Sequence, residues 1–179
     1  MAKRGIGSGD VVVGLAASGV TPYVLGALEY ANTKDAVTVG VTCNRNAPMA
    51  RVARILIAPE VGPEVVTGST RMKAGTAQKL VLNMLSTTAM VRLGHVYDNW
   101  MINVAQTNRK LRRRAERILR ETSGADVSRV RRALRQAGHN LRVALVMLKA
   151  DVDANEAQRR LRNAGGDLRA ALGEHRRRA

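Results

Sequence analysis

The first 60 residues contain three short, continuous runs of aliphatic side chains rich in β-branched residues, at positions 10–17, 36–43 and 54–59. Runs that stay apolar at every position are typical of strands buried on both faces, as in parallel sheets. Between the first two runs, residues 22–32 begin with a proline, which suits the first turn of a helix. This order predicts an α/β fold, with a mostly parallel sheet covered by helices. The expected strands cover residues 11–16, 37–42 and 54–58.

A longer segment, residues 72–93, is apolar on nearly every side of the helix that its spacing predicts. Helices that are apolar all round are usually buried. We therefore expect a central, buried helix here, with Gly94 as its stop signal.

Beyond residue 107 the sequence has only helical periodicity, and it contains an internal repeat. The stretch RRALRQAGHNLRVAL (131–145) matches QRRLRNAGGDLRAAL (158–172). Each copy predicts a helix, a glycine after its end, and Asn140 or Asp167 as the N-cap of the next helix. We expect two related helical hairpins whose buried leucines are Leu134, Leu141, Leu145, Leu161, Leu168 and Leu172.

Positive charge is concentrated in this helical half. The chain has a formal net charge of +16, and residues 106–179 carry twenty Lys and Arg against eight Asp and Glu. Such a basic region favours either nucleic-acid binding or a solvated helical surface. Single-strand binding needs aromatic stacking platforms, and the aromatic residues all lie in the less basic half. We expect a structural region and no nucleic-acid partner, with a basic nucleic-acid-binding protein as an alternative.

Cysteine content and hydropathy suggest a compartment. Cys43 is the only cysteine, so the chain has no internal disulfide, which fits a reducing environment. The sequence contains neither a membrane-spanning apolar run nor a signal-peptide pattern. We expect a cytoplasmic protein without a membrane partner. The histidines have no ligand spacing, so we also expect no metal and no cofactor.

Two turns before helices have the composition of anion sites. AASGVTP (16–22) follows a strand, and its Ser18 and Thr21 hydroxyls add to the free N–H groups of a helix start. An ordinary strand-to-helix turn is the alternative. The second turn, VVTGSTRMKAGTAQK (65–79), places Arg71 and Lys73 at the end of a helix where cations are disfavoured, unless an anion lies among them. Exposed cations that tolerate the dipole are the alternative there.

Hydroxyls of the second turn also suit a helix cap. We expect Thr67, Ser69 or Thr70 to cap the long helix. The carboxylates that suit acid or base chemistry are Glu29, Glu60 and Glu64, of which Glu64 is nearest this turn. Solvated loop glutamates explain these residues equally well.

The segments DVVVGLAASGVTPYVLGALEYA and EVVTGSTRMKAGTAQKLVLNMLSTTAMVRLGHVYDNWMINVAQTN closely resemble N-acetylmuramic acid 6-phosphate etherases, which belong to the sugar isomerase (SIS) domain family. The likeness continues through the helical tail. It implies a three-layer α/β sandwich followed by helices, with a site formed in a homodimer. It also implies metal-free cleavage of the D-lactyl ether, by elimination and rehydration, to N-acetylglucosamine 6-phosphate and D-lactate.

The resemblance also implies site residues and domains. Ser18, Gly19 and Thr21 would line a sugar-phosphate pocket, with Ser69, Thr70, Arg71 and Lys73 at or near it. Residues 1–105 would be the C-terminal part of a SIS domain, and residues 106–179 a basic helical domain.

One departure from the family matters for catalysis. Family members carry an upstream half with the first strand, a phosphate loop and two acid/base glutamates, whereas here MAKRGIGSGD leads directly into the later strands. We therefore expect the C-terminal portion of an etherase, in which the catalytic residues are not identified. The alternatives are a non-catalytic sugar-phosphate-binding or regulatory module and the nucleic-acid-binding protein named above.

Overall fold

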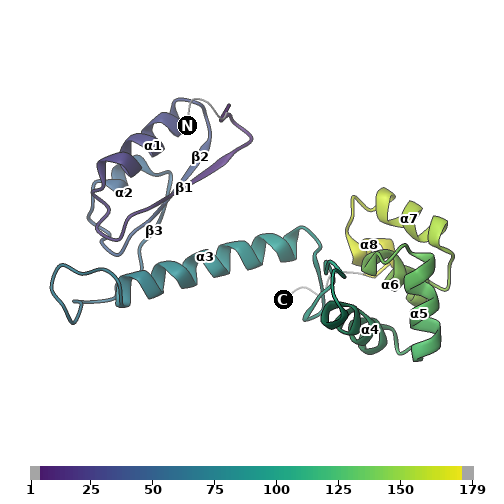
Figure 1. Ribbon diagram of the computed structural model, residues 1–179. Coiled ribbons are helices and arrows are strands. Elements are labelled where there is room, and N and C mark those ends of the chain that lie inside the picture. Colours follow the sequence, from purple (N-terminus) through teal and green to yellow (C-terminus); the bar gives the residue numbers. More distant parts are fainter. Residues whose placement is uncertain (1–4, 175–179) are drawn as a thin grey trace. The chain divides into compact units, whose positions relative to one another are not determined.

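The computed structural model describes residues 5–174, and the chain divides into two compact units between Ser86 and Thr87. The first unit is an α/β layer structure and the second is mainly helical (Figure 1). The expected division after residue 105 therefore falls inside the second unit, and the assignment of those domains stays a prediction.

The first unit is built on a three-stranded parallel sheet of order β1-β2-β3, in which Val11 pairs with Val37 and Val39 pairs with Ile55. This confirms the α/β prediction, and each strand is slightly shorter than expected. The strands are β1 (Val11–Leu15), β2 (Val37–Val41) and β3 (Ile55–Ile57). The helices are α1 (Pro22–Asn32), α2 (Met49–Val52) and α3 (Lys73–Arg92), which continues into the second unit.

One face of the sheet is covered by α1 and α2, around a small core of Ala16, Leu28 and Met49. Two glycines let these helices approach closely. A β-carbon on Gly14 would lie 2.8 Å from Val24 Cγ1, and one on Gly40 would lie 2.8 Å from Met49 Cγ. A larger residue at either position would push a helix off the sheet.

The other face meets α3, where Val81 packs against Val39, Val41 and Ile57. Ala74 and Val81 are the buried residues of this fully described helix. The prediction of a central, buried helix is therefore wrong for this chain. A sheet of three strands is narrow, so it covers only one stripe of α3 and leaves the other sides exposed.

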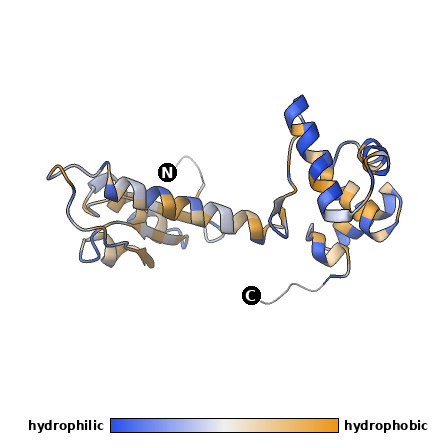
Figure 2. Cartoon of the chain, turned by 90° about the horizontal axis from the view of Figure 1, so that it is seen from below, coloured by the Kyte–Doolittle hydropathy of each residue, from blue (hydrophilic) through white to orange (hydrophobic). Residues whose placement is uncertain are grey.

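The uncovered apolar side chains form what we call the open face. On β1 they are the alternate residues that point away from α1, led by Val11, which is 62% exposed. Figure 2 shows apolar colour along α3 beyond the stripe that contacts the sheet. The members of the open face are Val11, Val13 and Leu15 of β1, and Leu80, Leu82, Met84 and Leu85 of α3.

The described part of the second unit packs three longer helices and a short one around α6, and α6 buries seven of its residues. Among the described residues no strand lies beyond Met101, which confirms the prediction of helices alone after residue 107. The helices are α4 (Arg109–Ser123), α5 (Val127–Gln136), α6 (Leu141–Ala150), α7 (Ala154–Asn163) and α8 (Leu168–Ala171).

The caps and glycines of the internal repeat lie where the sequence predicts them, although α8 is much shorter than α6. Asn140 Oδ1 accepts hydrogen bonds from the amides at the start of α6, and Asp167 Oδ1 does the same for α8. Gly138 and Gly165 follow α5 and α7 with φ of +58°, a left-handed conformation that suits glycine. Five of the six expected leucines are buried, and Leu172 is half-buried against the same core.

A short antiparallel hairpin, β4 (Val96–Tyr97) and β5 (Trp100–Met101), was not predicted. Tyr97 and Ile102 are buried in the helical core, so these residues belong structurally to the second unit. The Tyr97 hydroxyl contacts both carboxylate oxygens of Glu174 at 2.9 Å and accepts a hydrogen bond from Lys149. Lys149 Nζ also lies 2.7 Å from Glu174 Oε1. We call Tyr97, Lys149 and Glu174 the hairpin clamp.

Candidate functional site

The turn after β1 is bound to the loop after β2, at the edge of the sheet where the parallel strands end. Cys43 N donates to Ala17 O at 2.9 Å, and Met49 N donates to Gly19 O at 3.2 Å. Gly19 is buried with φ of +69°, and a β-carbon there would lie 2.4 Å from Ala47 Cβ. Gly19 is therefore required for this close approach. In open α/β sheets this edge is the usual ligand site.

The two hydroxyls predicted in this turn are exposed. Ser18 Oγ accepts a long hydrogen bond of 3.5 Å from Val20 N. Thr21 is the N-cap residue of α1, but within the described chain its side chain makes no capping hydrogen bond. Both hydroxyls are thus available to a ligand beside the first turn of α1.

Glu64 supplies the cap of α3. Its Oε2 accepts from Lys73 N at 3.1 Å and its Oε1 accepts from Ala74 N at 3.0 Å. The expected cap by a hydroxyl of Thr67, Ser69 or Thr70 is therefore wrong. A carboxylate can accept from both amides at once, and its charge is favourable at the positive end of a helix. These bonds, from Ala74 first and Lys73 second, lower the pKa of Glu64.

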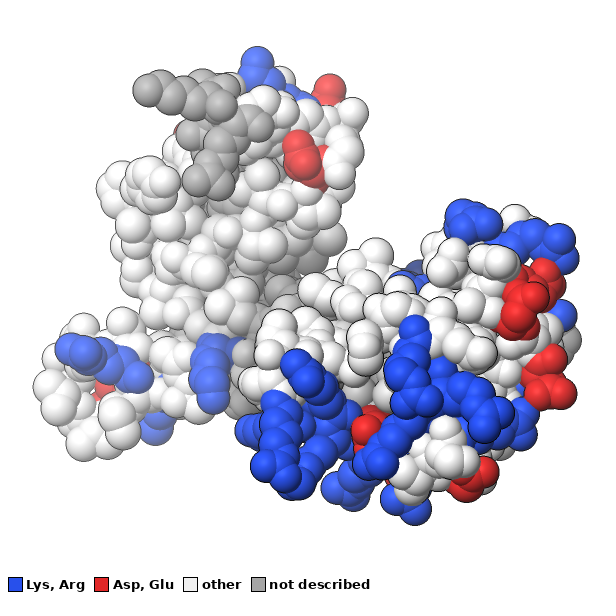
Figure 3. Space-filling model, turned by 45° about the vertical axis from the view of Figure 1, so that its right-hand side comes forward, with Lys and Arg blue, Asp and Glu red and all other residues white. Residues whose placement is uncertain are grey.

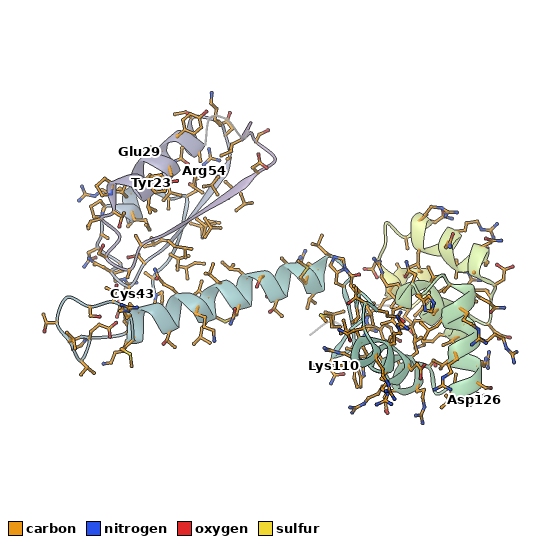
Figure 4. All side chains as sticks on the ribbon, in the orientation of Figure 1. Tyr23, Glu29, Cys43, Arg54, Lys110 and Asp126 are labelled. Carbon is orange, nitrogen blue, oxygen red and sulfur yellow. The ribbon has the colours of Figure 1, made fainter. Side chains whose placement is uncertain are left out.

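Cys43 joins this group from the end of β2. Its Sγ lies 4.0 Å from Ala74 O, and Figure 4 places Cys43 beside the first turn of α3. Burial raises the pKa of the Cys43 thiol, and the negative charge of Glu64 raises it further. Sequence reasoning missed Cys43 as a site residue, although its position directly after a buried strand was a usable signal.

The remaining predicted residues lie in the turn before α3 and at its start. Thr70, Arg71 and Lys73 are exposed, and Ser69 is half-buried. The turn is closed by its own backbone, since Gly75 N donates to Thr70 O at 2.9 Å. Cys43 links this region with the β1 turn, because it contacts both Ala17 and Ala74. A cavity shared by Ser18, Thr21, Ser69 and Lys73 stays a prediction.

The other candidate carboxylates lie elsewhere in the first unit. Glu29 is exposed on α1, and Glu60 pairs with Arg45 at 3.4 Å in an exposed loop. Within residues 5–174, no three His, Cys, Asp or Glu side chains gather as metal ligands. None of the described helices has both the length and the apolar composition needed to span a membrane.

Comparison with known proteins agrees with this architecture. Residues 3–88 match the SIS domain, which covers the sheet and most of α3. An N-acetylmuramic acid 6-phosphate etherase from Clostridium botulinum (strain Langeland) is 51% identical over 147 residues, which is 82% of this chain and 49% of that protein. The chain contains a SIS-domain match and is similar to such etherases over about four fifths of its own length. The etherase from Serratia proteamaculans is 55% identical over 145 residues, 81% of this chain and 49% of its own length.

A third etherase, from Pectobacterium atrosepticum, is 53% identical over 143 residues, covering 80% of this chain and 47% of its own. The chain thus spans about half the length of the etherases that it matches. The matched length exceeds that of the SIS domain, so the relationship to these etherases extends into the helical unit.

Proposed function

We propose that this chain forms part of an N-acetylmuramic acid 6-phosphate etherase and binds the amino-sugar 6-phosphate at the carboxyl edge of its sheet. The observation that carries the proposal is an identity of 50–55% to proteins of that name over about four fifths of the chain. The complete reaction is cleavage of the D-lactyl ether to N-acetylglucosamine 6-phosphate and D-lactate. We assign it to cytoplasmic recycling of cell-wall amino sugars.

The proposed sugar-phosphate site combines both turns. The Ser18 and Thr21 hydroxyls, with the backbone at Gly19, would bind the phosphate near the start of α1. Arg71 and Lys73 would complete its charge, with Ser69 and Thr70 nearby. The Lys73 and Ala74 amides at the start of α3 already donate to Glu64. This end of α3 would therefore bind the sugar phosphate through cationic side chains and hydroxyls.

We further propose that these 179 residues alone do not catalyse the reaction. Elimination needs a base for a carbon-bound proton and an acid for the leaving oxygen, and each such group contributes about 10²–10⁴-fold. Glu64 is bound to two amides with a lowered pKa, which makes it both a weak base and a poor acid near neutral pH. Glu29 and Glu60 lie on other, exposed parts of the unit.

The open face supports a requirement for partner surface. Large apolar side chains that are exposed on both β1 and α3 are typical of surfaces that bind another molecule. We propose that the half of the etherases that this chain does not match covers the edge at β1, and that two complete copies then form a dimer.

A reconstitution assay tests the proposal. The purified chain is incubated with N-acetylmuramic acid 6-phosphate, and D-lactate release is followed with and without the unmatched half of the Serratia proteamaculans etherase. We expect D-lactate release only when both halves are present. Ser18→Ala in this chain should reduce that release, whereas the matched control Ser128→Ala on α5 should leave it unchanged. Turnover by the chain alone, lost in Glu64→Gln, would make Glu64 catalytic and overturn the assignment.

A non-catalytic sugar-phosphate-binding module is the second candidate. The observation that favours it is the engagement of Glu64, the carboxylate nearest the proposed site, in a structural cap. It predicts calorimetric binding of amino-sugar 6-phosphates to the chain, with no lactate release even when the other half is supplied.

A further inference from the structure

The helical unit contains a cavity between the start of α6 and the end of α7. Its volume is about 470 Å³, within the range of small-molecule sites. The lining contains two guanidinium groups, two amides and no carboxylate. Among its residues are Asn140, Arg142, Gln158, Leu161, Arg162 and Gly166.

Arg142 lines this cavity and has donors that are not used elsewhere in the described chain. Its Nε and Nη2 atoms are buried and make no hydrogen bond to any described residue. Nη2 lies against Gly166, and a β-carbon on Gly166 would be only 3.1 Å from Nη2. The absence of a side chain at Gly166 therefore leaves room for the guanidinium. Buried charged donors without partners are rare, because losing water without a replacement bond is costly.

The internal repeat provides a direct comparison. Arg169 occupies the position in the second copy that Arg142 occupies in the first, 27 residues earlier, directly after the first residue of a helix. Arg169 forms ion pairs with Asp98 and Glu174. The same local sequence thus gives a neutralised arginine in one copy and buried, unpartnered N–H groups in the other. The difference comes from the surroundings of Arg142.

We propose that this cavity binds a small oxyanion, either a phosphate monoester or a carboxylate, through Arg142. A planar guanidinium with two free donors matches the oxygen pairs of both groups. Arg162 adds a second positive charge, and the amides of Asn140 and Gln158 can donate to further oxygens. The site lies in the helical unit, apart from the sheet edge, and its existence is independent of the proposed etherase function.

The concave position of these donors argues for a small ligand. Nucleic-acid backbones are contacted mainly by exposed cations that follow the phosphates. Arg142 instead lines a cavity, and its Nε and Nη2 atoms are buried without a hydrogen-bond partner among the described residues. The exposed arginines of α4 and α5 lack this arrangement.

The test is a titration of the full chain with inorganic phosphate and, separately, acetate, at constant ionic strength set with sodium chloride. The Nε–H resonance of Arg142 is followed by nitrogen-15 NMR, and affinity is measured by calorimetry. We expect a saturable shift of that resonance with at least one anion, and the tighter anion identifies the ligand class. Arg142→Gln should weaken binding about 10- to 100-fold.

Arg135→Gln is the matched control, because Arg135 is exposed on α5 and occupies the repeat position equivalent to Arg162. Arg135→Gln removes the same charge and should leave the affinity for the anion unchanged. Arg162→Gln should weaken binding, and it provides the test if Arg142→Gln fails to fold. Equal losses in Arg142→Gln and Arg135→Gln would indicate attraction by net charge alone and overturn the proposal. Absence of saturable binding of either anion would overturn it as well.

Discussion

At the scale of single residues, Glu64 accounts for a cation, Lys73, at the end of a helix where cations are disfavoured. Arg71 and Lys73 lie at the positive end of α3, and the carboxylate that caps this end also interacts with the charge of Lys73. Glu64→Gln removes the charge and one of the two strong acceptors. We expect the Lys73 and Ala74 amides to exchange with solvent about five- to tenfold faster, measured by hydrogen-exchange NMR.

The same cap has a defined pH dependence. Because the folded-state pKa of Glu64 is lowered, its contribution is present above the ordinary glutamate pKa and is lost as pH falls through the folded value. The variant and the native chain should therefore converge in acid. Equal exchange rates at neutral pH would contradict the capping role.

Binding of an amino-sugar 6-phosphate is the second prediction at this scale. Ser18→Ala and Lys73→Ala should each weaken binding roughly 10- to 150-fold by calorimetry, because each loses a contact to a charged group. Lys34→Ala, in the turn just after α1 and away from the start of that helix, is the control and should not change affinity. Unchanged affinity in both site variants would move the sugar-phosphate site elsewhere.

The sequence indicated the two turns of the proposed site but not the role of the Glu64 carboxylate as the cap of α3. Ser18, Thr21 and Ser69 are recognisable because hydroxyls and glycines before a helix have a local meaning. Glu64 lies nine residues before Lys73, far outside the short spacing of a capping motif. Only the folded loop brings its carboxylate back to the start of α3, so no local pattern could have predicted the bond.

At the scale of secondary-structure elements, α6 is the centre of the helical unit. Leu145 of α6 is fully buried, while its repeat counterpart Leu172 is only half-buried. Leu145→Ala should lower the free energy of unfolding by about 2–5 kcal/mol, and Leu172→Ala by less than half as much. Urea unfolding monitored by circular dichroism measures both. Equal losses would mean that the two copies are packed alike.

The hairpin clamp predicts a pH optimum for the helical unit. Burial of Glu174 opposes its charge, but bonds to Lys149 and Tyr97 outweigh this and lower its pKa. Burial of Lys149 by itself would lower its pKa, but the hydrogen bonds to Glu174 and Tyr97 outweigh this effect and raise the pKa. The clamp therefore stabilises the folded helical unit at pH values above the pKa of an unfolded glutamate and below that of an unfolded lysine.

Glu174→Gln should cost about 1–2 kcal/mol of unfolding free energy near pH 7. The difference from the native chain should vanish as pH falls through the lowered pKa of Glu174. Denaturant unfolding between about pH 3 and 8 measures this, with Glu121→Gln on α4 as an exposed control. A difference that is independent of pH would assign the loss to packing.

Elements with strong local signals were predictable, and those defined by distant contacts were not. The three strands, α1 and the repeat follow from apolar periodicity, a proline and the caps Asn140 and Asp167. The β4–β5 hairpin has only two residues in each strand, too few to show a period, and Tyr97 is held by the distant Glu174. The burial of α3 depends on sheet width, which its own sequence does not encode.

At the scale of the whole molecule, the charge distribution predicts weak nucleic-acid binding. Figure 3 shows Lys and Arg gathered over the helical unit, with few acidic side chains among them. These cations are exposed on helix faces while the leucines of the repeat are inside. We expect the chain to bind duplex DNA no tighter than micromolar at about 150 mM salt, measured by fluorescence anisotropy. Nanomolar, strongly salt-dependent binding would identify a nucleic-acid function.

The open face has a consequence in the living cell. A stretch of bare aliphatic surface on β1 and α3 is the kind of signal that chaperones and quality-control proteases recognise in orphan subunits. Any molecule that covers this surface stabilises the folded chain by mass action, and it also hides the signal. We therefore expect this polypeptide to persist longer in cells that also synthesise the proposed partner half, because the complex would hide the apolar surface.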